Sequence, residues 1–186
     1  MNTKNFLEFY QEQSWNGFFS DKGSAHDYIA AYYSPLFTPL QFESIKLLEI
    51  GYQEGRSARL WRDYFANAEL WMADCDEIVD NTLVPGINYL WGDTYTQDIL
   101  DKVEDGYFDF IIDDGPHTLA SQVYAVKHWT KKLKSGGRLI IEDLQDPAYL
   151  DILHAEAEQI GEIGRTCDMR ANKNRYDDII FEIIKK

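Results

Sequence analysis

Short runs of apolar residues alternate along this chain with longer amphipathic stretches, and this alternation limits its possible folds more than any other feature. Residues 45–50, 108–112 and 138–141 are rich in aliphatic and aromatic side chains, without the polar alternation of a half-exposed strand. Such strands are buried on both faces, which requires helices on either side of a largely parallel sheet. The pattern therefore predicts an α/β fold.

The remaining elements continue this alternation. Amphipathic or capped helices are expected at 56–66, from a Thr96 cap to 103, from a Thr118 cap to 133, and from Asp146-Pro147 onward. Further strands are expected at 69–73 and 87–91, and at 161–165 and 179–184 as an antiparallel hairpin at one edge. The sum is a seven-stranded, mostly parallel sheet with helices on both faces.

The first forty residues differ in character from the rest. They are rich in aromatic side chains (Phe6, Phe9, Tyr10, Trp15, Phe18 and Phe19), and Pro35 and Pro39 oppose any long helix. We expect one domain over residues 1–186, in which residues 1–40 form a lid or cap and residues 45–186 form the core.

Composition excludes several functional classes. The 18 basic residues against 32 acidic ones give a net charge of −14, which argues against nucleic acid as a partner. Two cysteines are too few for a disulfide framework or a zinc site. Neither a membrane-length apolar run nor a signal peptide is present, so a cytoplasmic location is expected.

A strand that runs into a glycine-bearing turn marks a candidate cofactor site. Gly51 and Gly55 follow the first predicted strand and would let the backbone approach a ligand closely. Asp74 ends the next strand, where a carboxylate can accept hydrogen bonds from ribose hydroxyls. Asp93 ends the strand after that, where it can accept one from an adenine amino group. Each Asp alone is more typical of a turn, but all three features in register favour an adenosine ligand.

Several segments together resemble the class I S-adenosylmethionine (SAM)-dependent methyltransferases, which have a Rossmann-like fold. More narrowly, the chain resembles the metal-dependent sugar O-methyltransferases of the mycinamicin and tylosin kind. The motifs that carry this narrower resemblance are Ser20-Asp21-Lys22-Gly23-Ser24-Ala25-His26-Asp27-Tyr28, Asp113-Asp114-Gly115-Pro116-His117 and Ile141-Glu142-Asp143.

The resemblance implies roles for the residues of the cofactor site. Glu49 and Gly51 would flank the methionine part of SAM, Asp74 would bind the ribose and Asp93 the adenine. Lys22 would pair as a point charge with a carboxylate, such as the carboxylate of SAM. The glycines of the first turn do not have the GxGxxG spacing of dinucleotide-binding enzymes, so a nicotinamide oxidoreductase is a weaker alternative.

Four carboxylates follow the fourth and fifth predicted strands, which are neighbours in the class I topology. Such like charges are unfavourable together unless a cation or protonation offsets them, and oxygen ligands suit a hard ion such as Mg²⁺. The resemblance selects Asp114, Glu142 and Asp143 as the metal ligands. Asp113 would instead support the turn or the cofactor.

His117 lies three residues beyond Asp114, at the start of the next helix. An imidazole there can remove a proton from an acceptor hydroxyl, and the resemblance makes His117 the general base. The alternative is a helix cap or a surface residue. Pro116 departs from the Ser common in relatives, but leaves the ligand and base positions intact.

The expected activity is SAM- and Mg²⁺-dependent O-methylation of a sugar hydroxyl on a glycan or glycosylated natural product. Asp21, His26 and Tyr28 of the lid motif are candidate contacts to SAM or the acceptor. The alternative is that they only pack within the lid. Two alternatives stay open: a catechol-like diol or phosphorus-linked acceptor, and a non-catalytic SAM- or nucleotide-binding module. The sequence also leaves open a homo-oligomer.

Overall fold

The computed structural model describes residues 3–15, 20–75 and 83–186. Phe18 and Phe19 of the predicted lid, and the side chain of Trp15, lie outside the described residues. The other predicted elements fall within them.

The core is one mixed sheet of seven strands. They are β1 (Lys46–Ile50), β2 (Glu69–Asp74), β3 (Asn88–Trp91), β4 (Phe108–Asp113), β5 (Leu133–Ile141), β6 (Gly164–Asp168) and β7 (Ile179–Ile184). Their order is β3-β2-β1-β4-β5-β7-β6, with β7 antiparallel to both of its neighbours. The predicted mostly parallel sheet with an antiparallel edge hairpin is therefore confirmed.

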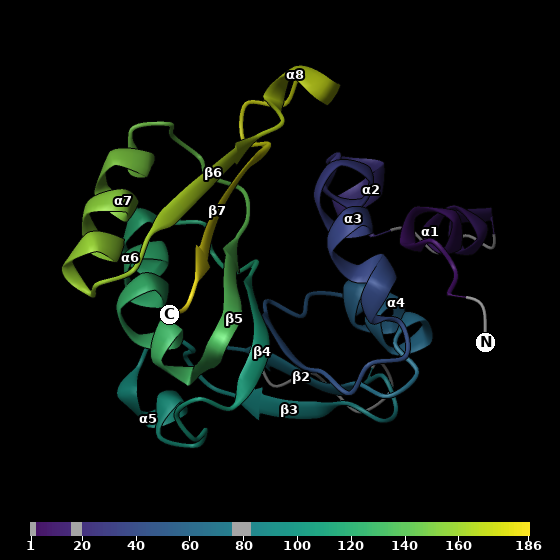
Figure 1. Cartoon of the computed structure of the whole chain (residues 1–186), viewed down its shortest axis with the longest axis horizontal. Helices are drawn as coiled ribbons and strands as arrows, with labels where there is room; N and C mark the ends of the chain where they lie inside the picture. The colour runs from purple at the N-terminus through teal and green to yellow at the C-terminus, as the bar shows by residue number, and fades with distance from the viewer. Residues whose placement is uncertain (1–2, 16–19, 76–82) are drawn as a thin grey trace.

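Helices cover both faces of the sheet, as predicted (Figure 1). The helix α4 (Arg56–Tyr64) lies on one side with the N-terminal helices, and α5 (Gln97–Leu100), α6 (Leu119–His128) and α7 (Tyr149–Gln159) lie on the other. Two buried clusters result, and strand alternation divides neighbouring residues between them. Leu47 belongs to one cluster and Leu48 to the other, and both are fully buried.

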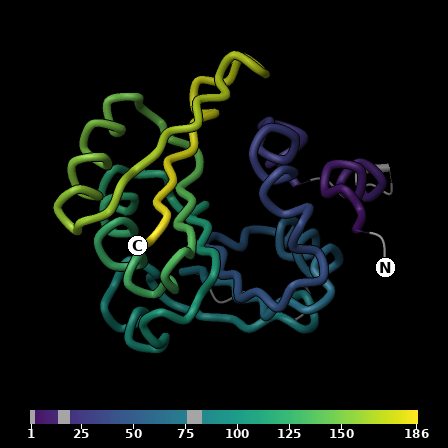
Figure 2. The backbone as a smooth tube through the Cα atoms, viewed as in Figure 1, coloured from purple at the N-terminus to yellow at the C-terminus, as the bar shows by residue number. Residues whose placement is uncertain are grey.

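The N-terminal segment is part of the core rather than a loose cover. It contains α1 (Phe6–Trp15), α2 (Asp21–Ser24), the π-helix η1 (Ile29–Tyr33), α3 (Ser34–Phe37) and the 3₁₀-helix η2 (Thr38–Leu40). Pro35 and Pro39 lie in the first turns of α3 and η2, so the helix type changes at each proline. Phe6 stacks on Trp61 of α4 with ring centroids 5.7 Å apart. Figure 2 shows this segment running beside α4, far from α7.

Several predicted boundaries were wrong. The helix expected from Asp146 begins at Tyr149, because the Asp146 side chain and carbonyl accept the Ala148 and Tyr149 N–H groups in a preceding turn. The strand expected at 161–165 is β6 (Gly164–Asp168), because Gly161, at φ 81°, ends α7 with a left-handed turn.

The third concerns the helix expected to reach 133. It becomes the 3₁₀-helix η3 (Trp129–Lys132), and Leu133 already belongs to β5. Leu133 pairs with Phe108 of β4 and is fully buried, so sheet pairing determines its conformation. The short helix predicted behind Thr96 ends at Leu100, and Thr96 makes no side-chain cap bond.

Gly51 lies where the carboxyl ends of three strands come closest. Its N–H donates to Ala73 of β2 at 2.8 Å, and Asp114 N–H donates to Ile50 of β1 at 2.9 Å. Its φ is +97°, and an added Cβ would lie 2.1 Å from the Asp114 carbonyl oxygen. Only glycine fits this turn without moving the β4 end.

The substitution Gly51→Ala tests this close approach. We expect it to reduce the free energy of unfolding by about 1–3 kcal/mol more than Gly161→Ala, because it adds a clash to left-handed strain. Gly161 is the matched control, since its φ is +81° and an added Cβ meets nothing within 4 Å. Urea unfolding of both variants gives the comparison, and equal losses would contradict the packing argument.

Candidate functional site

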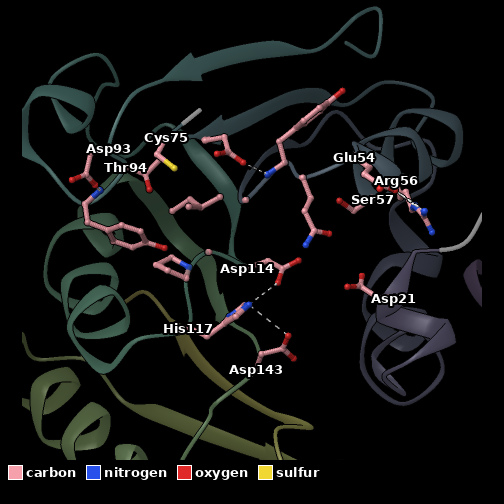
Figure 3. A pocket seen from close by; sticks show the side chains of 18 of the residues that line it. Asp21, Glu54, Arg56, Ser57, Cys75, Asp93, Thr94, Asp114, His117 and Asp143 are labelled. Carbon is pink, nitrogen blue, oxygen red and sulfur yellow. Dashed lines mark hydrogen bonds and ion pairs between the residues drawn. The ribbon is translucent and has the colours of Figure 1, made fainter. Parts of the chain in front are cut away.

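A cavity of about 1050 Å³ opens at the carboxyl ends of the parallel strands. In open α/β sheets this rim, where strand order reverses between β1 and β4, is the usual place for a ligand. Seven of the predicted site residues line it: Asp21, Gly51, Asp74, Asp93, Asp114, His117 and Asp143. Figure 3 shows Asp93 on a different side of this cavity from His117 and Asp143.

The predicted ribose and adenine carboxylates face the same cavity. Asp74 Oδ2 accepts the Tyr52 N–H at 2.7 Å, which fixes the carboxylate beside the β1 turn. Asp93 is exposed, and its Oδ1 accepts the Tyr95 N–H at 3.0 Å. Both residues therefore serve their turns and also present carboxylates to the cavity.

Glu49 and Gly55 are not among the cavity-lining residues that the structure describes. Glu49 is fully buried and accepts the Trp61 indole N–H at 2.8 Å. Burial raises the pKa of this carboxyl, although the Lys22 ammonium opposes the shift. Gly55 adopts φ 68° at the start of α4, against the Tyr52 ring. Both residues therefore support the turn between β1 and α4 without lining the cavity.

Asp113 also lies behind the cavity wall. It is 2% exposed, and its Oδ1 accepts the Tyr95 hydroxyl at 2.5 Å. Burial raises the pKa of Asp113 to about 7, although this hydrogen bond opposes the rise. The carboxyl is therefore partly protonated near neutral pH.

The predicted catalytic residues converge at one edge of the cavity. His117 Nε2 lies 3.8 Å from Asp114 Oδ1 and 3.8 Å from Asp143 Oδ2 (Figure 3). One ligand atom from each of the three residues lies within 4.8 Å of the other two. β4 and β5 are paired neighbours, so the carboxylates that follow them meet, as the sequence predicts.

Glu142, the third predicted metal ligand, is directed into the protein. It is 1% exposed and accepts the Tyr33 hydroxyl at 2.5 Å, and its other oxygen pairs with Lys22. Lys22 Nζ also lies 2.6 Å from Asp114 Oδ2 and 3.0 Å from Glu49 Oε1. The ammonium that was expected to bind the SAM carboxylate is thus occupied by carboxylates of the protein.

Lid residues contact the same carboxylates. The Tyr28 hydroxyl donates to Asp143 Oδ1 at 2.6 Å. His26 Nδ1 lies 2.5 Å from Asp178 Oδ1 and 3.3 Å from Asp143 Oδ1. Burial raises the pKa of Asp143, and the hydrogen bond from the Tyr28 hydroxyl opposes this rise. His26 and Tyr28 therefore act on the site through Asp143, behind the cavity-lining residues that the structure describes.

The sequence did not predict that Tyr33, Tyr95 and Trp61 hold carboxylates of the candidate site, or that Asp178 pairs with His26. The aromatic-rich N-terminal segment was noted for its packing. A buried Tyr or Trp also needs a hydrogen-bond partner for its O–H or N–H group. The sequence signal for these contacts was therefore an aromatic-rich segment predicted to cover the carboxylates at the strand ends.

The donor set fits a hard divalent cation in part. Asp114 Oδ1 and Asp143 Oδ2 both face the cavity beside His117, with side chains 22% and 14% exposed. Paired carboxylate oxygens of this kind suit Mg²⁺, whose remaining positions are commonly water. Glu142 would join only after leaving Lys22.

Asp113 makes folding depend on pH in a defined direction. Since its pKa is about 7 in the folded chain and near 4 when unfolded, the folded state retains a proton that the unfolded state loses between these values. The stability that this proton contributes is therefore lost as pH rises from about 4 to 7.

The variant Asp113→Asn removes this titration. Between pH 5 and pH 8 in EDTA, we expect it to lose less stability than the wild type, by on the order of 2 kcal/mol. Urea unfolding at both pH values measures the difference. Asp98→Asn, at an exposed position, is the control and should follow the wild type. Parallel profiles for all three proteins would refute the assignment.

Comparison with known proteins agrees with this geometry. A family model described as a methyltransferase domain matches residues 48–144. The fold and site define a Rossmann-like methyltransferase, and the chain belongs to this methyltransferase domain family.

Named relatives are more specific. The chain is 30% identical over 181 residues to the 8-demethyl-8-(2-methoxy-alpha-L-rhamnosyl)-tetracenomycin-C 3'-O-methyltransferase of Streptomyces olivaceus, covering 88% of this chain and 43% of that protein. It is 27% identical to the mycinamicin VI 2''-O-methyltransferase of Micromonospora griseorubida, covering 68% of this chain and 34% of that protein. The chain thus spans less than half the length of these relatives.

A solved structure shares the fold over the full chain. It is the MycE methyltransferase from the mycinamycin biosynthetic pathway, in complex with Mg and S-adenosylhomocysteine (SAH). The TM-score is 0.74 at 20% identity, covering 100% of this chain and 56% of that one. Among the described residues, no helix has the length and apolar character needed to span a bilayer.

Proposed function

We propose that this protein is a SAM- and Mg²⁺-dependent O-methyltransferase that acts on a sugar hydroxyl of a glycan or glycosylated natural product. The observation that carries the proposal is the convergence of Asp114, Asp143 and His117 in a cavity that Asp74 and Asp93 also line. The names of the relatives, which are O-methyltransferases of rhamnosyl and macrolide compounds, support the choice of acceptor.

The cavity has room for a donor and an acceptor together. Its volume of about 1050 Å³ lies at the upper end of ordinary ligand pockets. In this proposal SAM lies with its methionine part over the Gly51 turn, its ribose at Asp74 and its adenine at Asp93. The acceptor approaches from the side of His117, which brings its hydroxyl toward the methyl group.

Asp114 and Asp143 would hold the divalent cation, and Glu142 would complete the predicted set. Bound there, the cation supplies positive charge that lowers the pKa of the acceptor hydroxyl. His117 accepts the hydroxyl proton at Nε2 as the methyl group transfers from sulfur to oxygen. The carboxylates of Asp143 and Asp114, each 3.8 Å from Nε2, stabilise the imidazolium charge after the ring takes the proton.

The N-terminal segment has a place in this proposal. The chain acts as a single methyltransferase domain over residues 1–186, in which residues 1–40 cover the site. Lys22, Tyr28 and Tyr33 support this arrangement, because each contacts an acidic residue at the sheet rim. Methyl transfer requires the nucleophile, carbon and sulfur nearly in line, and a fixed cover restricts that geometry.

His117→Ala tests the general base. With labelled SAM, Mg²⁺ and a panel of glycosides and nucleotide-sugars, we expect kcat to fall by about 10²-fold or more. SAH affinity should stay near that of the wild type, because His117 lies on the acceptor side. His154→Ala, at an exposed position, is the matched control. Normal turnover by His117→Ala would place the base elsewhere, and methylation of a catechol alone would change the acceptor class.

Asp74→Asn tests the cofactor site by calorimetry. We expect SAH to bind the wild type and to bind this variant about tenfold or more weakly, because a charged acceptor of ribose hydrogen bonds is lost. Asp98→Asn is the control. Binding of NADH in place of SAH would overturn the methyltransferase proposal.

The metal requirement has its own test. EDTA should abolish methyl transfer and added Mg²⁺ should restore it. In this proposal the cation that Asp114 and Asp143 hold is the divalent charge that acts on the acceptor hydroxyl. Labelled-methyl transfer before and after dialysis measures this. Full activity in EDTA would remove Mg²⁺ from the mechanism and leave the SAM site untouched.

A further inference from the structure

The ammonium of Lys22 lies at the centre of the acidic cluster. Lys22 belongs to α2, and its side chain is 2% exposed. It makes ion pairs with Glu49 of β1, with Asp114 just beyond β4 and with Glu142 just beyond β5. One positive charge therefore serves three carboxylates from three neighbouring strand ends.

This ammonium uses the oxygens that a divalent cation needs. Asp114 offers Oδ2 to Lys22 and Oδ1 to the His117 side of the cavity. Glu142 offers Oε2 to Lys22 and Oε1 to the Tyr33 hydroxyl, so both of its oxygens are engaged. The predicted set of three metal ligands can assemble only if Lys22 gives up Glu142.

Glu49 provides a place for the ammonium to remain. Its Oε1 is fully buried and accepts no well-directed hydrogen bond, although Lys22 Nζ is 3.0 Å away. Its other oxygen is held by Trp61 at 2.8 Å, so this carboxylate is fixed in position. A shift of Nζ toward Glu49 would improve that ion pair while it frees the other two carboxylates.

We propose that Lys22 is an internal cation that competes with the divalent metal for Asp114 and Glu142. Without metal, Lys22 offsets part of the negative charge of the cluster and attaches α2 to the sheet rim. When metal binds, the ammonium withdraws from Glu142 and Asp114 and keeps its pair with Glu49. This inference rests on the proposed metal site and adds a residue that sets its affinity and links it to the N-terminal segment.

Lys22→Met tests the competition, because it keeps the apolar stem and removes the charge. With SAM absent, we expect the variant to bind Mn²⁺ at least tenfold more tightly than the wild type, measured by the spin-resonance signal of free Mn²⁺. The metal-free variant should unfold at a lower urea concentration, and Mn²⁺ should stabilise it more than it stabilises the wild type. Equal or weaker Mn²⁺ binding by the folded variant would overturn the proposal.

Lys132→Met is the matched control. Lys132 is also buried, at 8% exposure, and pairs with Asp105 at 2.7 Å outside the site. Its removal should leave Mn²⁺ affinity unchanged. Lys22→Arg keeps the charge, so it should bind Mn²⁺ no more tightly than the wild type.

A measurement on the wild type covers the case in which Lys22→Met does not fold. The ¹⁵Nζ resonance of Lys22 should shift on addition of Mg²⁺, while that of Lys132 should not. An unshifted Lys22 signal at saturating Mg²⁺ would refute the competition and leave the metal site in place. Failure of both the wild type and Lys22→Met to bind any divalent cation would remove the metal site and the inference together.

Discussion

The meeting of three buried or half-buried carboxylates around one ammonium is the interaction on which this structure depends. Removing an unpaired charge from water costs several kcal/mol, so burial of Glu49 and Glu142 requires that a neighbouring cation or a bound proton offset their charge. Lys22 supplies a cation from the N-terminal segment. The same contact therefore offsets part of the negative charge at the sheet rim and holds α2 against it.

The position of this cluster follows from the topology of the sheet. The chain leaves β1 toward β2 on one side of the sheet and leaves β4 toward β5 on the other. The loops that follow β1 and β4 therefore turn away from each other and leave a cavity between them. Asp74 and Asp93 follow β2 and β3, whereas Asp114 and Asp143 follow β4 and β5. The residues proposed for nucleotide recognition and for proton transfer are thus separated along one rim, which is the arrangement that the proposed two-substrate transfer needs.

Two of the four non-glycine residues with positive φ in the described part of the chain lie at the edge where Asp114, His117 and Asp143 meet. His117 and Asp143 both have φ of 55°, although neither is glycine. Such conformations cost of order 1 kcal/mol or more and persist only where surrounding contacts impose them. The Tyr28 hydroxyl accepts the Asp143 N–H at 3.3 Å and donates to its carboxylate, so the N-terminal segment helps to impose this geometry.

Local sequence determined the elements of the fold and the residues that end its strands. Apolar runs predicted β1 and β4, and the carboxylates after β2 to β5 were predicted to share one rim because parallel strands end on the same side. Only the tertiary structure decided which carboxylate faces the cavity and which is buried. Lys22 and Glu142 are 120 residues apart, and Tyr33 and Glu142 are 109 apart. Such pairings depend on how the N-terminal segment packs on the sheet, and this packing leaves no periodic signal in the sequence.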